Sequence, residues 1–225
     1  MHLEHLTLHA PDLSAQRAFY ALTLGLPICH DTPEAFTVQV GRSRLSFRQG
    51  DTPAAHFAVD IPRTLVAQAQ AWLEARVPLL ADPDGRVRFG PDGAFHSSNL
   101  YFRDPAGHIA EFIARHDLPF DHAGPFGPQH ALHLSEFGLV VPDVTGAVDW
   151  LEARLGLCAW VGRSPTFTPV GGADGSLIVV PRGRGWFPVG LPGQPVPFRL
   201  AYRQGQAQRS LTPADLPFLR PQVLA

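Results

Sequence analysis

The chain repeats itself at long intervals, and this duplication constrains its fold more than any other feature. The stretch that begins at Leu3 recurs from Leu134, so that Pro11-Asp12 falls on Pro142-Asp143. The string WLEAR also occurs twice in the chain. Repeats longer than about 50 residues indicate duplicated supersecondary modules rather than a solenoid of short repeats.

Each repeated unit reads as a strand, a helix and further strands. In the first unit, alternating residues predict a strand over 3–9 that places Leu3, His5 and Thr7 on one face. The next helix is expected to begin with Ser14 as its N-cap and to stop at Gly25. The remaining predicted elements are strands over 35–40, 43–48, 56–61, 86–89, 98–103 and 108–114, a helix over 64–76, a third unit over 134–181 and a fourth that begins at 196–202.

These elements predict an α+β fold in which tandem βαβββ modules form curved sheets with their helices outside. We expect the first two units to lie side by side as a complete two-module domain over residues 1–116 that closes a cup. Residues 117–131, rich in Pro, Gly and His, read as a linker. Residues 132–225 read as a degenerate half without a site of its own.

Composition narrows the class of protein. The 225 residues suffice for one large domain or two small ones, and 45% hydrophobic with 17% charged residues is typical of a globular chain. A net charge of −2 gives no indication of a nucleic-acid or acidic-membrane partner. We find neither a membrane-spanning run nor a signal-peptide pattern, so the expected location is cytoplasmic.

Residue usage excludes some chemistry. All eighteen basic residues are arginine, so a lysine Schiff base and a P-loop are excluded. The two cysteines, Cys29 and Cys158, are expected to be small buried residues rather than parts of a disulfide framework or zinc knuckle.

Three residues carry the main functional signal. His5, His56 and Glu111 occupy look-alike positions in three predicted strands that are more than 50 residues apart. Two imidazoles and a carboxylate that converge on one point form a facial site for a divalent metal, with coordination positions left open for a substrate. The sequence therefore predicts a three-ligand metal site.

The strings around these residues resemble the vicinal oxygen chelate superfamily, which includes glyoxalase I, extradiol dioxygenases and fosfomycin-resistance enzymes. The resemblance is carried by HLTL from His5, HFAVD from His56 and LYFRDPAGHIAE, which ends at Glu111. It implies that these three residues bind a divalent metal, Fe or Mn being favoured and Zn or Ni being open. It also implies catalytic roles for Tyr101 and Thr7 on a small-molecule substrate.

Departures from the family patterns leave the reaction open. Ser46 stands near the place of a fourth ligand in glyoxalase I, and residues 42–55 lack the auxiliary histidine of extradiol enzymes. Glu136 aligns with His5, so the third unit reads as having lost the site. A dioxygenase-like reaction on a small oxygenated metabolite is the leading hypothesis. A lyase, isomerase or thiol-transferase, and a non-catalytic binding protein, are the alternatives, and a homodimer stays open.

Overall fold

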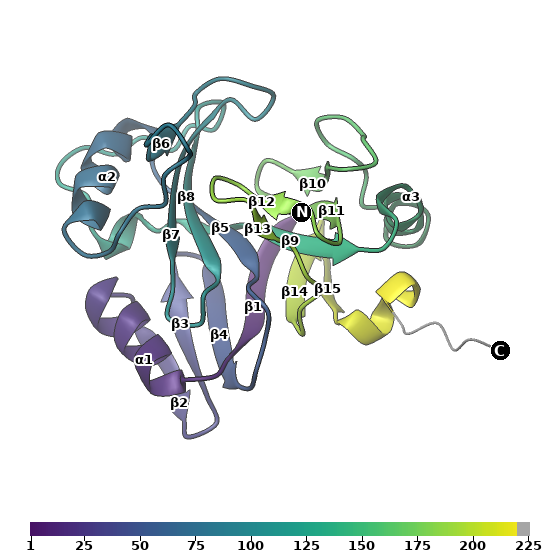
Figure 1. Cartoon of the computed structure of the whole chain (residues 1–225), viewed down its shortest axis with the longest axis horizontal. Coiled ribbons are helices and arrows are strands. Elements are labelled where there is room, and N and C mark those ends of the chain that lie inside the picture. The colour runs from purple at the N-terminus through teal and green to yellow at the C-terminus, as the bar shows by residue number, and fades with distance from the viewer. Residues whose placement is uncertain (220–225) are drawn as a thin grey trace.

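Two large twisted sheets form the body of the molecule, with helices on their outer sides (Figure 1). The computed structural model describes residues 1–219. The six-stranded sheet runs in the order β15 (Ala207–Leu211), β14 (Arg199–Gln204), β1 (His2–Ala10), β4 (Ser43–Gln49), β3 (Ala35–Val40) and β2 (Ile28–Thr32). The seven-stranded sheet runs in the order β10 (Thr168–Gly172), β11 (Gly175–Pro181), β9 (His133–Val141), β5 (His56–Asp60), β8 (Ile109–Arg115), β7 (Ser97–Arg103) and β6 (Arg88–Phe89). A short ribbon pairs β12 (Gly185–Trp186) with β13 (Leu191–Pro192).

The predicted α+β architecture of βαβββ modules is confirmed, and the units pair in a nested order. The first unit shares its sheet with the fourth through β1 and β14, whereas the second shares its sheet with the third through β5 and β9. The expectation that units one and two together close a cup over residues 1–116 is therefore wrong, because their strands lie in different sheets. Residues 117–131 connect β8 to β9 and contain one 3₁₀ turn at Pro128–His130. Residues 220–225, the last part of the predicted C-terminal half, lie outside the described residues.

The central strand pair of one sheet has the same register as the central strand pair of the other. In the six-stranded sheet, β1 and β14 pair Leu6 with Leu200 and His5 with Ala201, and the register then shifts past Glu4. In the seven-stranded sheet, the pairs between β9 and β5 show the same shift past Ser135. A β-bulge therefore occupies the same place in both duplicated halves.

The bulge changes which residues of β1 share a face. Leu3 lies on the buried side with Leu6 and Leu8, whereas His5 and Thr7 lie on the opposite, partly exposed side. The prediction that placed Leu3 with His5 is wrong, because an extra residue reverses the alternation of a strand. One face of this sheet is thus apolar and faces the core, and the other is polar.

Aspartate side chains cap the N-termini of the first and third helices. The carboxylate of Asp12, rather than the predicted Ser14, caps α1 (Leu13–Ala18) by accepting from the Ala15 amide, and a π-helical turn extends α1 over Phe19–Thr23. Asp143 caps α3 (Val144–Leu155) in the same way, and Gly156 ends it in the left-handed region at φ +66°. The second helix, α2 (Val66–Glu74), follows a 3₁₀ turn at Arg63–Leu65.

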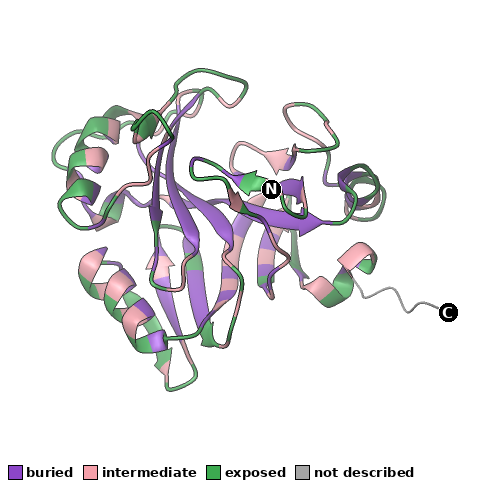
Figure 2. Ribbon diagram, in the orientation of Figure 1, coloured by how far each residue is buried: buried purple, intermediate pink, exposed green. Residues whose placement is uncertain are grey.

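Burial is concentrated in the sheets. Figure 2 shows the central strands almost wholly buried, while the helices carry exposed outer stripes. Every residue of β5, β8 and β9 is buried, including polar and charged ones. Cys29 and Cys158 are exposed free thiols, so the expectation that they are buried is wrong. Within residues 1–219, no helix is long and apolar enough to cross a membrane.

Candidate metal centre

Three buried side chains from neighbouring strands meet in the seven-stranded sheet. They are His56 on β5, Glu111 on β8 and Glu136 on β9, and their ligand atoms all lie within 4.8 Å of one another. The His56 Nε2 atom lies 3.4 Å from Glu111 Oε2 and 3.9 Å from Glu136 Oε2. Because β8 and β9 flank β5 on opposite sides, one carboxylate approaches the imidazole from each side.

A hydrogen bond and a ring contact orient the imidazole of His56. Its Nδ1 lies 3.2 Å from the Ile109 carbonyl oxygen, to which it donates, so Nε2 faces the two carboxylates. The Trp186 ring lies against the imidazole with 5.0 Å between centroids. This packing depends on Gly138, because a Cβ there would come within 2.6 Å of the indole. Nε2 is thus oriented either to carry a proton or to bind a metal ion.

Glu111 is held by two polar neighbours. The Asn99 amide donates to Oε1 of Glu111, and the phenol of Tyr101 also forms a hydrogen bond with this carboxyl group. Burial, followed by the nearby charge of Glu136, raises the pKa of Glu111 to about 7. Burial also raises the pKa of Tyr101 well above its ordinary value, so its phenol stays protonated and can donate.

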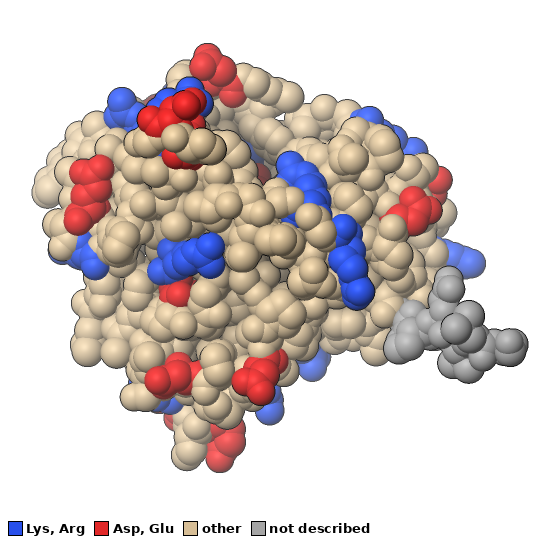
Figure 3. All heavy atoms as spheres, viewed as in Figure 1, with Lys and Arg blue, Asp and Glu red and all other residues tan. Residues whose placement is uncertain are grey.

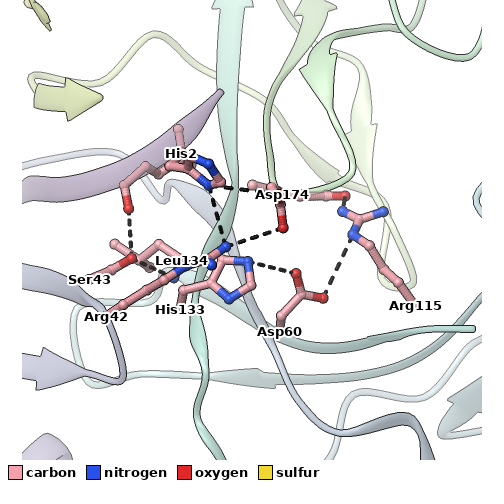
Figure 4. Close-up of polar contacts among 10 residues, drawn as sticks. His2, Arg42, Ser43, Asp60, Arg115, His133, Leu134 and Asp174 are labelled. Atoms are coloured by element: carbon pink, nitrogen blue, oxygen red, sulfur yellow. Dashed lines mark hydrogen bonds and ion pairs between the residues drawn. The ribbon is translucent and has the colours of Figure 1, made fainter. Parts of the chain in front are cut away.

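Glu136 is stabilised as a carboxylate by a buried guanidinium. Arg115 Nη2 donates to Glu136 Oε1 at 2.6 Å. Burial alone would raise the pKa of Glu136, but hydrogen bonds and charges from His56 and Arg115 lower it. Arg115 Nε also lies 3.7 Å from Asp60, whose other oxygen lies 3.0 Å from His133 Nε2. Figure 4 shows Asp60 between the Arg115 guanidinium and the His133 imidazole.

The donor set fits a divalent cation. Two buried carboxylates and an imidazole meet at one point, and Arg115 pairs with one of the carboxylates, Glu136. The raised pKa of Glu111 reflects its burial first and the charge of Glu136 second, and a bound cation would stabilise the charged form against both. His56, Glu111 and Glu136 are the residues that would hold such an ion.

A cavity of about 200 Å³ opens above the three residues. Its floor is polar and its walls are largely aromatic, which is typical of a small-molecule site. The lining consists of His56, Asp92, Gly93, Ala94, Phe95, Ser97, Asn99, Tyr101, Glu111, Ile113, Glu136, Phe167, Ile178, Arg184, Trp186 and Phe187.

The structure brings together only part of the predicted site. His56 and Glu111 meet as expected, and Tyr101 lines their cavity. His5 does not join them: it lies on β1 of the other sheet, where its Nε2 is 2.6 Å from Ser46 Oγ. Thr7 lies on the same strand, so its predicted contact with substrate at the metal site is not supported.

Glu136 takes the place that the sequence analysis gave to His5. The repeat aligns the two positions, and the shared bulge confirms that they are equivalent in the two sheets. The available signal was that alignment, which places a carboxylate where the first unit has an imidazole. The prediction that the third unit has lost the site is therefore wrong in this respect. That unit supplies Glu136, one of the three converging side chains.

Comparison with solved structures supports the fold. A proposed dioxygenase from Bacillus subtilis superposes with a TM-score of 0.58 at 19% identity, covering 80% of this chain and 63% of that protein. Glyoxalase I from Zea mays superposes with a TM-score of 0.54 at 16% identity, covering 80% of this chain and 66% of that protein. The chain thus spans just under two thirds of each. No protein-family model and no curated protein matches the sequence. The predicted vicinal oxygen chelate resemblance is confirmed at the level of fold.

Proposed function

We propose that this protein is a metal-dependent enzyme that acts on a small oxygenated metabolite in the cavity of the seven-stranded sheet. One observation carries the proposal: His56, Glu111 and Glu136 present their ligand atoms within 4.8 Å of one another at the floor of that cavity. Three protein ligands leave coordination positions for a substrate.

The donor set narrows the choice of metal. Exchange of the predicted His5 for Glu136 changes two imidazoles and one carboxylate into one imidazole and two carboxylates. Carboxylates suit hard ions such as Mn(II), and imidazole suits Fe, Zn and Ni. We therefore favour Mn(II), followed by Fe(II), with Zn(II) and Ni(II) as competitors.

The residues around the cavity suit a planar oxygenated substrate. Phe95, Phe167 and Phe187 supply aromatic walls, which can pack on a ring and exclude water. The protonated phenol of Tyr101 can donate to a substrate oxygen at the floor. When bound, the metal would supply Lewis-acid stabilisation of negative charge on substrate oxygen atoms. A dioxygenase-like reaction remains our leading assignment.

One feature favours a lyase or isomerase as the second candidate. Burial raises the pKa of the Glu111 carboxyl to about 7, the range in which a side chain best accepts and returns a proton. Such a group could move a proton between neighbouring substrate atoms. The cavity lining also contains no histidine besides His56, so it offers no counterpart of the auxiliary histidine of extradiol enzymes.

Metal analysis with a matched pair of variants tests the proposal. We expect about one first-row metal ion per wild-type chain by plasma mass spectrometry, and loss of that metal in His56→Ala and Glu136→Ala. His5→Ala is the control, because it removes the predicted imidazole that lies in the other sheet; its metal content should stay unchanged. If the wild-type protein neither retains nor binds Mn, Fe, Zn or Ni, the cavity belongs to a non-catalytic binding protein instead.

A further inference from the structure

The polar face of the six-stranded sheet carries a second cluster, and two of its residues occupy positions equivalent to those of the candidate metal centre. With the two registers aligned, His5 corresponds to Glu136, and Arg199 corresponds to His56. Arg44 lies beside His5 on the neighbouring strand β4. At the two equivalent positions the six-stranded sheet carries an imidazole and a guanidinium where the seven-stranded sheet carries a carboxylate and an imidazole.

Buried hydroxyl groups connect this cluster. The Ser46 Oγ atom lies 2.6 Å from His5 Nε2 and 2.6 Å from Thr37 Oγ1, which forms a chain across β1, β4 and β3. Ser46 and Thr37 are only 6% and 7% exposed, although they lie on the polar face of the sheet. The chain borders a hollow of about 460 Å³ that is lined by His5, Cys29, His30, Thr37, Gln39 and Arg44.

The cluster contains cations without balancing acids. Within residues 1–219, neither Arg44 nor Arg199 forms an ion pair, and no carboxylate lines the hollow. The nearest acid on β1, Glu4, is paired with Arg203. Burial, then the charges of Arg44 and Arg199, lowers the pKa of His5, which shows that both guanidinium groups act on this imidazole.

We propose that this hollow is a second binding site, which takes a small oxyanion carried as a phosphate or carboxylate group. Arg44 lines the hollow, and Arg199, on the neighbouring strand β14, pairs with Thr7, so its guanidinium belongs to the same polar face. Guanidinium groups can bind such oxygens with two parallel hydrogen bonds. Thr37 and His5 also line the hollow, and because the two hydrogen bonds to Ser46 use two of the three polar protons of this chain, one donor is left for a ligand when His5 is neutral. An anion would also relieve the repulsion among these cations. The site is independent of the proposed metal-dependent activity.

Calorimetric titration with inorganic phosphate, and separately with acetate, tests this site at constant ionic strength. We use His56→Ala protein as the background, so that an anion bound to a metal ion cannot contribute. We expect millimolar or tighter binding of at least one probe, and a loss of about tenfold or more in the double variant Arg44→Gln/Arg199→Gln. The probe that binds more tightly identifies the phosphate or the carboxylate source.

The control is Arg154→Gln, an exposed arginine at the end of α3 that removes the same charge elsewhere. It should bind the probe as the background protein does. If the double variant fails to fold by circular dichroism, Ser46→Ala replaces it, with an expected loss of several-fold. Absence of binding by both probes, or an equal loss in Arg154→Gln, would overturn the proposal.

Discussion

The two sheets of this protein have the same backbone plan and opposite chemistry. Both pair their central strands in one register and interrupt it with a bulge at the same place. The seven-stranded sheet gathers two carboxylates and an imidazole, whereas the six-stranded sheet has His5 at the position of Glu136, Arg199 at the position of His56, and Arg44 beside His5. Charges are interspersed on the face shown in Figure 3, so the contrast is local. Strand pairing thus fixes where side chains meet, and the residues alone decide what they bind.

The largest expected difference between the sheets is in the cost of losing an arginine. Arg115→Met should lower the free energy of unfolding by about 3–5 kcal/mol, because it leaves Glu136 and Asp60 buried without their cation. The matched change Arg203→Met removes a half-exposed pair with Glu4 and should cost about 1 kcal/mol or less. Urea unfolding measures both, and equal costs would contradict the contrast.

The hydrogen bonds around the metal ligands give the second largest effect. Asn99→Ala and Tyr101→Phe should each weaken metal binding about 10–100-fold, because they release Glu111 from the groups that orient it. Thr37→Val removes a hydroxyl of comparable burial in the other sheet and should leave metal affinity unchanged. Competition with a chelating indicator measures these affinities; an effect of Thr37→Val would show that the two sites are coupled.

The pH should act on the two sites in opposite directions. The pKa of Glu111 is raised to about 7, so below that pH a metal must displace a proton, and its affinity should fall up to about tenfold per pH unit. Binding at the other site of sulfate, an oxyanion probe whose own charge stays constant over this pH range, should instead strengthen as pH falls, because His5 gains a positive charge only below its lowered pKa. The charged groups that act on His5 are Arg44 and Arg199, and His30 lines the same hollow. Binding titrations at several pH values measure how each affinity changes with pH. If the metal affinity and the anion affinity changed in the same direction, the predicted contrast between the two sites would be refuted.

The smallest expected effect concerns Thr7. Its side chain lies on the polar face of the six-stranded sheet, with no hydrogen bond within residues 1–219. Thr7→Val should therefore change neither metal content nor turnover, and should shift stability by no more than about 0.5 kcal/mol. A several-fold loss of turnover would restore the catalytic role that the sequence resemblance implies.

The sequence predicted the modules well and their partners poorly. Strands over 35–40 and 43–48, and the meeting of His56 with Glu111, follow from local pattern and spacing. Alternation of apolar residues reports which face of a strand is buried, but it contains no information about which units pair at their edges. His5 was therefore assigned to the wrong sheet. The bulge at Glu4 could not be predicted for a related reason, because a single extra residue in a strand does not alter the composition of the segment.

The nested order of the units also has a consequence for synthesis of the chain. The strands of units two and three, which carry His56, Glu111 and Glu136, are complete once β11 has left the ribosome, so their sheet can form while translation continues. By contrast, β1 pairs with β4 on one side and must wait for β14, almost 200 residues later, on the other. Until then its edge is an unpaired template for other strands. A chain that terminates before Arg199 would keep this edge permanently, and we expect such a fragment to aggregate with its seven-stranded sheet already assembled.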